Sequence, residues 1–415
     1  MPSPWPTAQL GTVTVNHDSR RSPVREIDRK AGPYPYYGAS GVVDHVDEYI
    51  FEGLHLLIAE DGENLRSRQT PVAFLADGKF WVNNHAHIVT GNERADTRYL
   101  CYALISSDIS GYLTGSAMPK LTQKAMNAIE IPLPPIGIQR GIAGVLGTLD
   151  DKIEHNRRTS RALESLARAI FKAWFVDFEP VKAKAAGAKS FPSMPQPAFD
   201  ALPNRFTDSE LGPIPAGWKA GQMGDVGVTK RDQVAPEDIN EETPYFGLEH
   251  MPRHSIALSE WGNVGSVVSG KFRFASGDIL FGKLRPYFHK VGIAPIEGVC
   301  STDIVVLAPK TKEWRSWLLM LVSSDEFVSH ADQTSAGTKM PRTNWSDMAD
   351  FATAVPPEPL SRVFEAITRP MIDLTLASIH ESRKLAELRD LLLPKLMSGE
   401  VRVRDAQRAL TNGKA

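Results

Sequence analysis

An internal repeat dominates this sequence: the second half of the 415-residue chain matches the first half at a distance of 222 residues. Gly115-Ser-Ala-Met-Pro-Lys120 aligns without a gap with Gly337-Thr-Lys-Met-Pro-Arg342. The register continues through the Pro-Pro pairs that end at residues 135 and 357. Near the start of each half the match resumes at a shorter distance of 213 residues, from Trp5 to Trp218. A tandem duplication of this kind indicates one scaffold that carries two diverged binding units, and its pseudo-two-fold symmetry suits a two-fold object such as duplex DNA.

Each half consists of a globular segment followed by a long helical segment. Short apolar runs, such as residues 54–58 and 80–82, alternate with Asp-Gly and Asn-Asn turn signals, which is typical of mixed strands and helices. In the second half, residues 278–281 correspond to the first of these runs, and Ile304 corresponds to Ile88. We therefore predict an α+β chain: two similar mixed α/β domains separated by two long antiparallel helices that form a coiled coil. The predicted boundaries are 1–137 (domain 1), 138–178 (helix 1), 179–214 (a linker rich in Ala, Lys and Pro), 215–357 (domain 2) and 358–403 (helix 2).

The helical segments carry apolar residues at alternating steps of four and three, which is the seam pattern of a coiled coil. Polar residues interrupt both seams at the same level, where Asn156 corresponds to Ser378, and such a polar position often fixes register. Pro370 is expected to kink or restart the second helix. The alternative is a pair of ordinary amphipathic helices, each packed on its own domain. The predicted seam residues are Ile142, Leu149, Asn156, Leu163, Leu166, Ile170, Phe364, Met371, Ser378, Leu385, Leu388 and Leu392.

The charge balance gives no general footprint of a nucleic-acid-binding protein. The chain has 47 basic and 49 acidic residues, for a net charge of −2. Residues 1–137 carry 12 basic and 15 acidic groups and residues 201–357 carry 15 and 19, whereas residues 138–190 carry 10 and 6, and residues 358–415 carry 10 and 8. If the globular domains contact DNA, they must therefore do so through local patches.

No catalytic constellation can be assembled from the sequence. Neither Pro-Pro pair has the polar and aromatic neighbours of an amino-methyltransferase loop, and the phosphate-loop-like run at 265–271 is followed by Phe272 where a hydroxyl must ligate Mg²⁺. His85 and His87 have a spacing that would allow a shared metal on a strand. No cysteine or carboxylate cluster accompanies them, so a hydrogen-bonded strand edge is the better interpretation. We expect neither catalytic residues nor a metal site.

Cysteine usage and hydropathy point to the cellular compartment. The only two cysteines, Cys101 and Cys300, lie one in each half, which indicates a reducing environment without a disulfide framework. The N-terminal residues lack a signal pattern, and no apolar run approaches twenty residues. We therefore expect a cytoplasmic protein that makes no membrane contact.

Several motifs, spread in order along nearly the whole chain, resemble those of the specificity subunits of type I restriction–modification systems. They are Phe51-Glu-Gly-Leu-His-Leu-Leu-Ile-Ala-Glu-Asp-Gly62, Met118-Pro-Lys-Leu121, Ile131-Pro-Leu-Pro-Pro-Ile-Gly-Ile-Gln139, Leu149-Asp-Asp-Lys-Ile153 with Asn156, Trp174-Phe-Val-Asp-Phe178, Asp208-Ser-Glu-Leu-Gly-Pro-Ile-Pro-Ala-Gly-Trp218 and Leu392-Leu-Pro-Lys-Leu-Met-Ser-Gly399. One departure lies at residues 353–361, where the second copy matches the family less closely than the first.

The resemblance implies a non-catalytic subunit that binds double-stranded DNA. In that family each of two target-recognition domains reads one half of a split sequence, and two helices set the spacing. Two modification (methyltransferase) subunits dock on the scaffold, and restriction subunits join to form the endonuclease. S-adenosylmethionine, ATP and Mg²⁺ are then expected on those partner subunits, with no cofactor in this chain.

Local basic and amide-bearing patches are the candidates for DNA contact, because Arg, Lys, Asn and Gln read base edges and bind phosphates. The alternative for each residue is a solvated turn. A coiled-coil adaptor without DNA specificity is the competing function, although it would not explain two elaborated and diverged domains. The candidates are Lys120, Gln123 and Lys124 in the first domain and Lys283, Arg285, Tyr287, Lys290, Lys339, Arg342 and Asn344 in the second.

Overall fold

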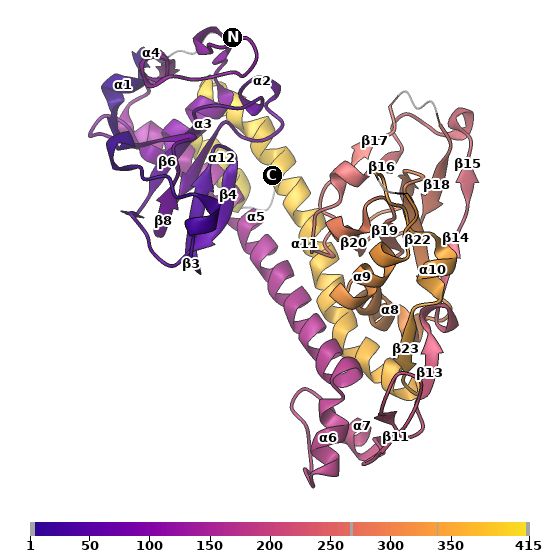
Figure 1. Cartoon of the computed structure of the whole chain (residues 1–415). Coiled ribbons are helices and arrows are strands. Elements are labelled where there is room, and N and C mark those ends of the chain that lie inside the picture. Colours follow the sequence, from indigo (N-terminus) through magenta and orange to yellow (C-terminus); the bar gives the residue numbers. More distant parts are fainter. Residues whose placement is uncertain (1–4, 266–268, 338, 412–415) are drawn as a thin grey trace. The chain divides into compact units, whose positions relative to one another are not determined.

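The computed structural model describes residues 5–265, 269–337 and 339–411, and the chain divides into two compact units (Figure 1). Unit 1 comprises Met1–Lys152 and Leu385–Ala415, and unit 2 comprises Ile153–Lys384. Two long helices, α5 (Ile136–Phe171) and α11 (Glu358–Met397), each contribute one end to both units. The phosphate-loop-like run at 265–271 includes residues 266–268, which lie outside the described residues.

Unit 1 is built on an antiparallel sheet in the order β2-β9-β6-β7. A second sheet has the order β4-β3-β8-β5, in which β3 and β8 run parallel, and β1 pairs with β10. The strands are β1 (Thr7–Gln9), β2 (Thr14–Asn16), β3 (Ala31–Gly38), β4 (Gly41–Val46), β5 (Phe51–Glu52), β6 (His55–Ala59), β7 (Ala73–Ala76), β8 (Lys79–Val82), β9 (Ala86–Gly91) and β10 (Glu130–Pro132). The helices are α1 (Leu10–Val13), α2 (Asn64–Ser67), α3 (Thr97–Ser106), α4 (Gln123–Ala128) and α12 (Val403–Thr411).

Unit 2 repeats this plan with an antiparallel sheet in the order β14-β22-β19-β20. Its second sheet, β15-β18-β21-β16-β17, contains one parallel pair, β16 with β21, and β13 pairs with β23. The strands are β11 (Phe206–Thr207), β12 (Ile214–Pro215), β13 (Lys219–Gln222), β14 (Gly227–Lys230), β15 (Gln233–Val234), β16 (Pro244–Phe246), β17 (Gly262–Asn263), β18 (Lys271–Phe274), β19 (Ile279–Gly282), β20 (Val291–Ile293), β21 (Gly298–Cys300), β22 (Ile304–Pro309) and β23 (Ala352–Val355). The helices are α6 (Glu179–Ala185), α7 (Gln196–Ala201), α8 (Arg315–Val322), α9 (Asp325–Gln333) and α10 (Trp345–Ala349).

The matching sheet orders confirm the predicted class of two similar mixed α/β domains with two long helices. Strand register also corrects one detail of the sequence alignment. Ala59 lies opposite Ala86 in unit 1, and Gly282 lies opposite Ile304 in unit 2, so Ile304 is equivalent to Ala86 and not to Ile88. Because side chains alternate along a strand, a shift of two residues in the alignment does not change which residues face each side of the sheet. By this register His85 corresponds to Asp303.

The two long helices run antiparallel wherever they meet inside a unit. In unit 1, Arg389 Nη1 donates to Asp150 Oδ1 at 2.8 Å. In unit 2, Asn156 Nδ2 donates to Glu381 Oε2 at 2.7 Å and to Ser382 Oγ at 3.3 Å. Further along α5 in unit 2, the Phe171 ring packs against Phe364 of α11, so residue numbers rise along α5 as they fall along α11. The polar interruption at Asn156 satisfies its side chain by hydrogen bonds across the helix pair, as a buried amide requires.

The buried stripe of α5 differs from the predicted seam. In unit 2 the buried positions of α5 are Ile153, Asn156, Ser160, Glu164, Ala167 and the adjacent pair Ile170 and Phe171. From Ile153 to Phe171 the buried stripe advances in steps of three and four that average close to the ~3.6 residues per turn of a straight helix. A strict heptad repeat averages 3.5 residues per step. Its positions therefore lag further behind the buried positions as the helix proceeds.

The outcome for the predicted seam residues follows from this drift. The prediction for Leu166 is wrong, since its side chain is 47% exposed. Ile142, Leu149, Asn156, Ile170, Phe364 and Ser378 are buried, and Leu163, Met371, Leu385, Leu388 and Leu392 are half-buried.

Pro370 does not restart α11, which runs without interruption from Glu358 to Met397. Proline removes the hydrogen bond to the carbonyl of Ala366, but both residues are exposed, so water can satisfy that carbonyl. No helix within the described residues combines the length and the apolar character that crossing a membrane requires.

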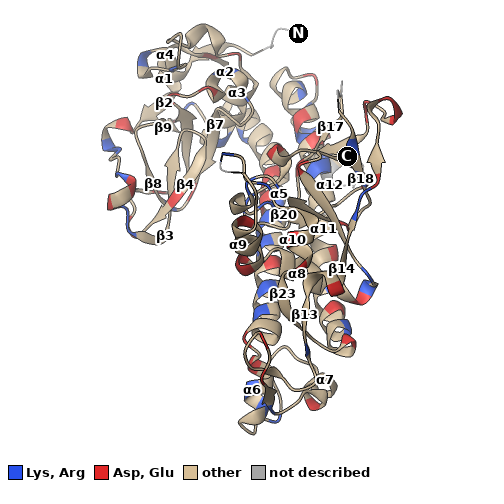
Figure 2. Cartoon of the chain, turned by 45° about the vertical axis from the view of Figure 1, so that its right-hand side comes forward, with Lys and Arg blue, Asp and Glu red and all other residues tan. Residues whose placement is uncertain are grey.

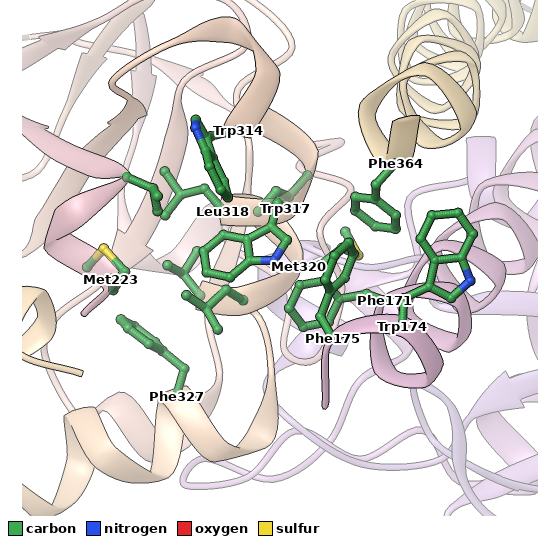
Figure 3. Packing of buried hydrophobic residues seen from close by; sticks show 14 of the residues in the cluster. Phe171, Trp174, Phe175, Met223, Trp314, Trp317, Leu318, Met320, Phe327 and Phe364 are labelled. Atoms are coloured by element: carbon green, nitrogen blue, oxygen red, sulfur yellow. The ribbon is translucent and has the colours of Figure 1, made fainter. Parts of the chain in front are cut away.

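The end of α5 continues into a π-helical turn (Lys172–Val176) that enters the core of unit 2. Figure 3 shows Phe171, Trp174 and Phe175 from this region packed beside Phe364 of α11 and Trp317 of α8. The rings of Phe175 and Phe364 lie 5.1 Å apart, edge to face. Aromatic packing of this kind contributes beyond the area it buries.

The segment predicted as a linker, residues 179–214, is ordered and packs on the same core. It contains α6 and α7, and it buries Val181, Met194, Phe199 and Leu202. The Lys184 ammonium donates to the carbonyls of Phe199 and Leu202, which ties the two short helices together.

Candidate nucleic-acid interface

The repeated Gly-x-x-Met-Pro sequence forms an equivalent exposed loop in each unit. Loop 1 comprises residues 114–120, and loop 2 comprises residues 336–342, of which residue 338 lies outside the described part. Thr114 and Lys120 exchange two main-chain hydrogen bonds of 2.8 Å, and Ala336 and Arg342 exchange two of 3.0 and 2.9 Å. The second residue of each loop is a glycine with a left-handed backbone, at φ +85° for Gly115 and +100° for Gly337, a conformation that glycine adopts most readily.

Each loop is fastened to the segment that follows the central strand β6 or β19. In unit 1, Gly62 N–H donates to the Pro119 carbonyl at 3.2 Å, and Leu121 N–H donates to the Glu60 carbonyl at 2.8 Å. In unit 2 the corresponding bonds run from Arg285 to Pro341 at 2.7 Å and from Thr343 to Lys283 at 3.1 Å. The main-chain frame is therefore the same in both units, and it does not depend on side-chain identity.

The side chains on this frame differ in charge. Glu60 of unit 1 corresponds to Lys283 of unit 2, His85 corresponds to Asp303, and Lys120 corresponds to Arg342. Lys120 Nζ lies 3.4 Å from Glu60 Oε1, whereas Arg342 Nε lies 3.0 Å from Asp303 Oδ1. Hydrogen bonding to Asp303 raises the pKa of Arg342. Each loop cation thus has an acidic partner, but Glu60 follows β6 in unit 1, whereas Asp303 precedes β22 in unit 2.

A buried charged network supports loop 1. His87 in β9 places Nδ1 2.6 Å from Asp18 Oδ2 and Nε2 2.8 Å from the Leu121 carbonyl. Both neighbours are hydrogen-bond acceptors, so both ring nitrogens must carry protons and the imidazole is cationic. Glu60 completes the network through Arg21, whose Nη1 lies 2.7 Å from Glu60 Oε2.

The pKa values in this network shift as the charges require. Burial opposes the charged form of His87, but the hydrogen bonds to Asp18 and Leu121 prevail and raise its pKa. Burial likewise opposes the ionised forms of Asp18 and Glu60, and the bonds from His87, Ile88 N–H and Arg21 outweigh it and lower the pKa of both carboxyls.

His85 and His87 do not converge on a common metal position. His87 is buried in β9, while His85 is half-exposed in the preceding turn and bonds Asp61 Oδ2 through Nδ1 at 2.9 Å. The prediction of a strand edge is wrong for His87, because β9 lies between β2 and β6 in the sheet. No sequence pattern indicates that Asp18 and Arg21 belong to this cluster.

The basic segment 283–290 of unit 2 contains both fixed and exposed side chains. Lys290 Nζ donates to the Leu248 carbonyl, and burial lowers the pKa of this lysine. Arg285, with a left-handed backbone at φ +51°, donates through Nη2 to the Lys339 carbonyl at 3.4 Å, while its buried Nε has no hydrogen-bond partner among the described residues. Tyr287 is 51% exposed. Lys283 is half-buried.

The remaining candidates lie at the start of the helix that follows each loop. Asn344 caps α10, because its Oδ1 accepts from Asp347 N–H at 3.0 Å and its Nδ2 donates to Asp347 Oδ2 at 2.7 Å. Thr122 caps α4 in the same way in unit 1. The structure therefore gives the Asn344 side chain a capping role. Lys339, Gln123 and Lys124 are exposed.

Basic and acidic side chains are interspersed on both units (Figure 2). Any attraction for an anionic partner must therefore come from the local arrangement at the loops and not from a single-sign surface.

Comparisons with known proteins agree with this architecture. The profile of the type I restriction modification DNA specificity domain matches residues 2–165. The chain is 25% identical to the type I restriction enzyme MjaIX specificity subunit of Methanocaldococcus jannaschii over 389 residues, which covers 90% of this chain and 85% of that protein. It is 24% identical to the EcoDI specificity subunit of Escherichia coli, with 86% and 79% covered.

Among solved structures, the crystal structure of the S subunit of a type I restriction–modification system from M. genitalium shares the fold. The TM-score is 0.59 at 15% sequence identity, and the match covers 95% of this chain and 96% of that one. The duplicated mixed α/β units, the two long helices and the sequence relatives agree with one another. Over most of its length the chain is similar to specificity subunits of type I restriction–modification systems, and its residues 2–165 match their DNA specificity domain.

Proposed function

We propose that this chain is the subunit through which a type I restriction–modification complex recognises DNA, with each unit reading one half of a bipartite target. The supporting observation is the pairing of a constant main-chain frame with different side chains in loops 1 and 2. Two readers with the same docking geometry but different side chains can recognise two different short sequences. Catalysis belongs to other subunits.

The proposed contacts lie on and beside the two loops. At the exposed turn, Lys339 of loop 2 corresponds to Ala117 of loop 1, and Met340 corresponds to Met118. Lys339 is suited to a phosphate contact, while Arg285 and Tyr287 stand beside the loop where they can approach the groove. Lys120 and Arg342 would exchange their present acidic partners for DNA, while Lys283, Gln123 and Lys124 flank the loops.

The long helices are proposed to set the distance between half-sites and to dock two modification subunits. Support comes from the participation of both helices in both units, and from exposed leucines on them at positions 166, 374 and 391. S-adenosylmethionine would bind to the modification subunits, and ATP with Mg²⁺ to the restriction subunits, so this chain needs no cofactor for its role.

Matched insertions test this function. Four residues inserted after both Lys152 and Lys384 add about 6 Å and close to one turn to each helix at the division between the units, so both helix pairs keep their internal contacts. With base pairs about 3.4 Å apart, the gap in the methylated motif should grow by about two base pairs. Methylome sequencing of a host strain should show the two half-site sequences unchanged.

The control for this experiment is a four-residue insertion after Gly187, an exposed turn in unit 2, which should leave the gap as it was. An active complex whose gap stays constant after the helix insertions would contradict the spacing role. Altered half-sites would contradict the assignment of reading to the two units.

A further inference from the structure

Three side chains that could bind a metal converge in unit 2. His254 lies in the loop after Met251, His289 follows the 3₁₀ turn Pro286–Phe288, and Asp325 is the first residue of α9. One ligand atom from each, a ring nitrogen or a carboxylate oxygen, lies within 4.8 Å of the other two. Among the described residues, no other group of three or more His, Cys, Asp and Glu side chains has this geometry.

The His289 ring is oriented by a backbone carbonyl. Its Nε2 lies 3.0 Å from the Ser323 carbonyl oxygen, which can only accept a hydrogen bond, so Nε2 carries the proton and donates. In a neutral ring, Nδ1 then presents a lone pair. That lone pair faces Asp325 Oδ1 at 3.4 Å, and a carboxylate oxygen is also an acceptor. Two facing acceptors repel each other unless a cation or a proton lies between them.

The separation fits a bound ion. A tetrahedral ion with bonds of about 2.0–2.1 Å to nitrogen and oxygen holds its ligand atoms about 3.3 Å apart, close to the observed 3.4 Å between Nδ1 and Oδ1. Metal-binding histidines typically donate their second ring N–H to a carbonyl or carboxylate, as His289 does to Ser323. The ring of His254 lies beside it, with the two centroids 4.3 Å apart.

The main chain already holds the two imidazoles together. His254 N–H donates to the His289 carbonyl at 3.0 Å, and both residues have left-handed backbones, at φ +54° and +52°. The His289 side chain is buried and the Asp325 side chain is 86% exposed, so the cluster is open to solvent on one side. The nearby Arg168 guanidinium also donates to the Ser323 carbonyl, but Glu164 pairs with this arginine at 2.8 Å and compensates its charge.

We propose that His254, His289 and Asp325 form a site for a divalent transition-metal ion of the zinc type, with water completing the coordination. Two imidazoles and one carboxylate are the ligand set that such ions accept. The ion would join the turn at 286–289 to the start of α9 and thereby order the basic segment 283–290. This consequence for DNA contact rests on the proposed function, whereas the metal site does not.

Isothermal titration of the purified full-length protein with Zn²⁺, after chelator treatment and dialysis, tests the site. We expect one saturable equivalent per chain. The variants Asp325→Asn and His254→Asn should each bind at least about tenfold more weakly; asparagine is chosen at 254 because it tolerates a left-handed backbone. Both positions are exposed, so the metal-free variants should melt with the wild type.

His85→Asn serves as the matched control, since His85 also pairs with a carboxylate, Asp61, but has no second histidine in a three-ligand group. It should bind Zn²⁺ as the wild type does. The absence of a saturable equivalent in the wild type would overturn the site. Equal affinity in the wild type and the Asp325→Asn variant would overturn it as well.

Hydrogen exchange tests the ordering role separately. Zn²⁺ should slow exchange of the amides at 287–290 in the wild type and have no effect in Asp325→Asn. Zinc binding without this protection would refute the ordering role. DNA is absent from both measurements, so they remain interpretable even if the proposed DNA recognition fails.

Discussion

Loops 1 and 2 share a main-chain frame but rest on different supports. Beneath loop 1, the buried cation of His87 lies between Asp18 and the Leu121 carbonyl. In unit 2 the strand position equivalent to His87 is Val305, an apolar residue that packs against the hydrophobic core. Loop 2 relies on its main-chain bonds and on the ion pair of Arg342 with Asp303 at the surface.

This difference shows which part of the duplicated unit is free to change. Main-chain hydrogen bonds place the loop in both units, so side chains around it can be replaced without moving it. The exchange of Glu60 for Lys283 reverses the charge at one equivalent position while the bond from Leu121 or Thr343 to its carbonyl persists. Separation of geometry from side-chain chemistry is what two readers of different sequences require.

The largest difference between the two loops is expected when a buried charge beneath loop 1 is removed. Asp18→Ala should destabilise the sheet of unit 1 by about 3–5 kcal/mol, because it leaves the buried His87 cation without its counter-charge. Asp303→Ala should have little effect, since it releases a half-exposed arginine to solvent. Hydrogen exchange followed on peptides from β9 and β22 measures each unit separately, as a two-unit chain need not unfold in one step.

Two controls refine this test. Asp18→Asn keeps the shape and should retain part of the stability through the Ile88 N–H bond. Equal losses from Asp18→Ala and Asp303→Ala would mean that the two loops have the same kind of support.

Substitution of the loop glycines should also destabilise loop 1 more than loop 2, but by smaller amounts. A Cβ on Gly115 would lie 2.3 Å from the Met118 carbonyl oxygen, whereas a Cβ on Gly337 would lie 3.3 Å from that of Met340. Gly337→Ala should cost about 1–2 kcal/mol from its left-handed backbone, and Gly115→Ala should cost more because the loop must also open. Exchange rates of the Lys120 and Arg342 amides report the two closures, and a larger effect at Gly337 would reverse the expected order.

The pH dependence should appear in loop 1 alone. The pKa of His87 is raised in the folded chain, so its stabilising contribution is complete below about pH 6.5 and is lost as the pH rises through the folded value. The lowered pKa values of Asp18 and Glu60 act oppositely: their contribution is complete above about pH 4.3 and is lost as the pH falls. Protection of loop 1 should therefore be greatest between these limits.

Exchange of the Lys120 amide, corrected for its intrinsic pH dependence, checks this. The loss of protection above about pH 6.5 should not exceed ~1.4 kcal/mol per pH unit, the limit for one proton. Loop 2 has Val305 at the strand position of His87, so it serves as the internal control. His87→Gln should abolish the alkaline loss, and a similar loss in both loops would refute its origin in His87.

The smallest expected effect concerns the loop tips, where Lys339 of loop 2 corresponds to Ala117 of loop 1. If Lys339 contacts a phosphate, Lys339→Ala should reduce the slope of log affinity against log salt by about one, and Ala117→Lys should increase it by about one. Both changes should leave the methylated sequence as it is. Binding of the assembled complex to its target at several salt concentrations provides the slopes, and an unchanged slope for Lys339→Ala would place this residue off the DNA.

The parts of the fold that could be predicted are those that local sequence patterns determine. The repeated loop sequence, the strand-and-turn composition and the helical periods each depend on neighbours in the sequence. Asp18, Glu60 and His87 come from separate segments that only strand pairing brings together, so the sequence offered no reason to group them. The same holds for His254, His289 and Asp325, which follow no metal-binding spacing.

The prediction of Leu166 as a seam residue failed for a related reason. An apolar pattern favoured Leu166, but the buried side of α5 at this level carries Glu164, whose carboxylate accepts from Ile256 N–H and Ser255 Oγ at 3.1 Å. A charged side chain that is buried because a distant loop supplies its donors cannot be recognised from hydrophobic periodicity.

The division of the chain has a consequence for its synthesis on the ribosome. Unit 2 is one continuous stretch, whereas the core of unit 1 needs Leu393, Leu396 and Met397 from α11 and Ala406 from α12. These residues are translated after the whole of unit 2. Unit 2 can thus begin to fold first, and the unit that starts earliest on the ribosome is the last to be completed. A chain halted before α12 would leave the core of unit 1 incomplete, and exposed apolar surface of this kind makes a polypeptide prone to aggregation.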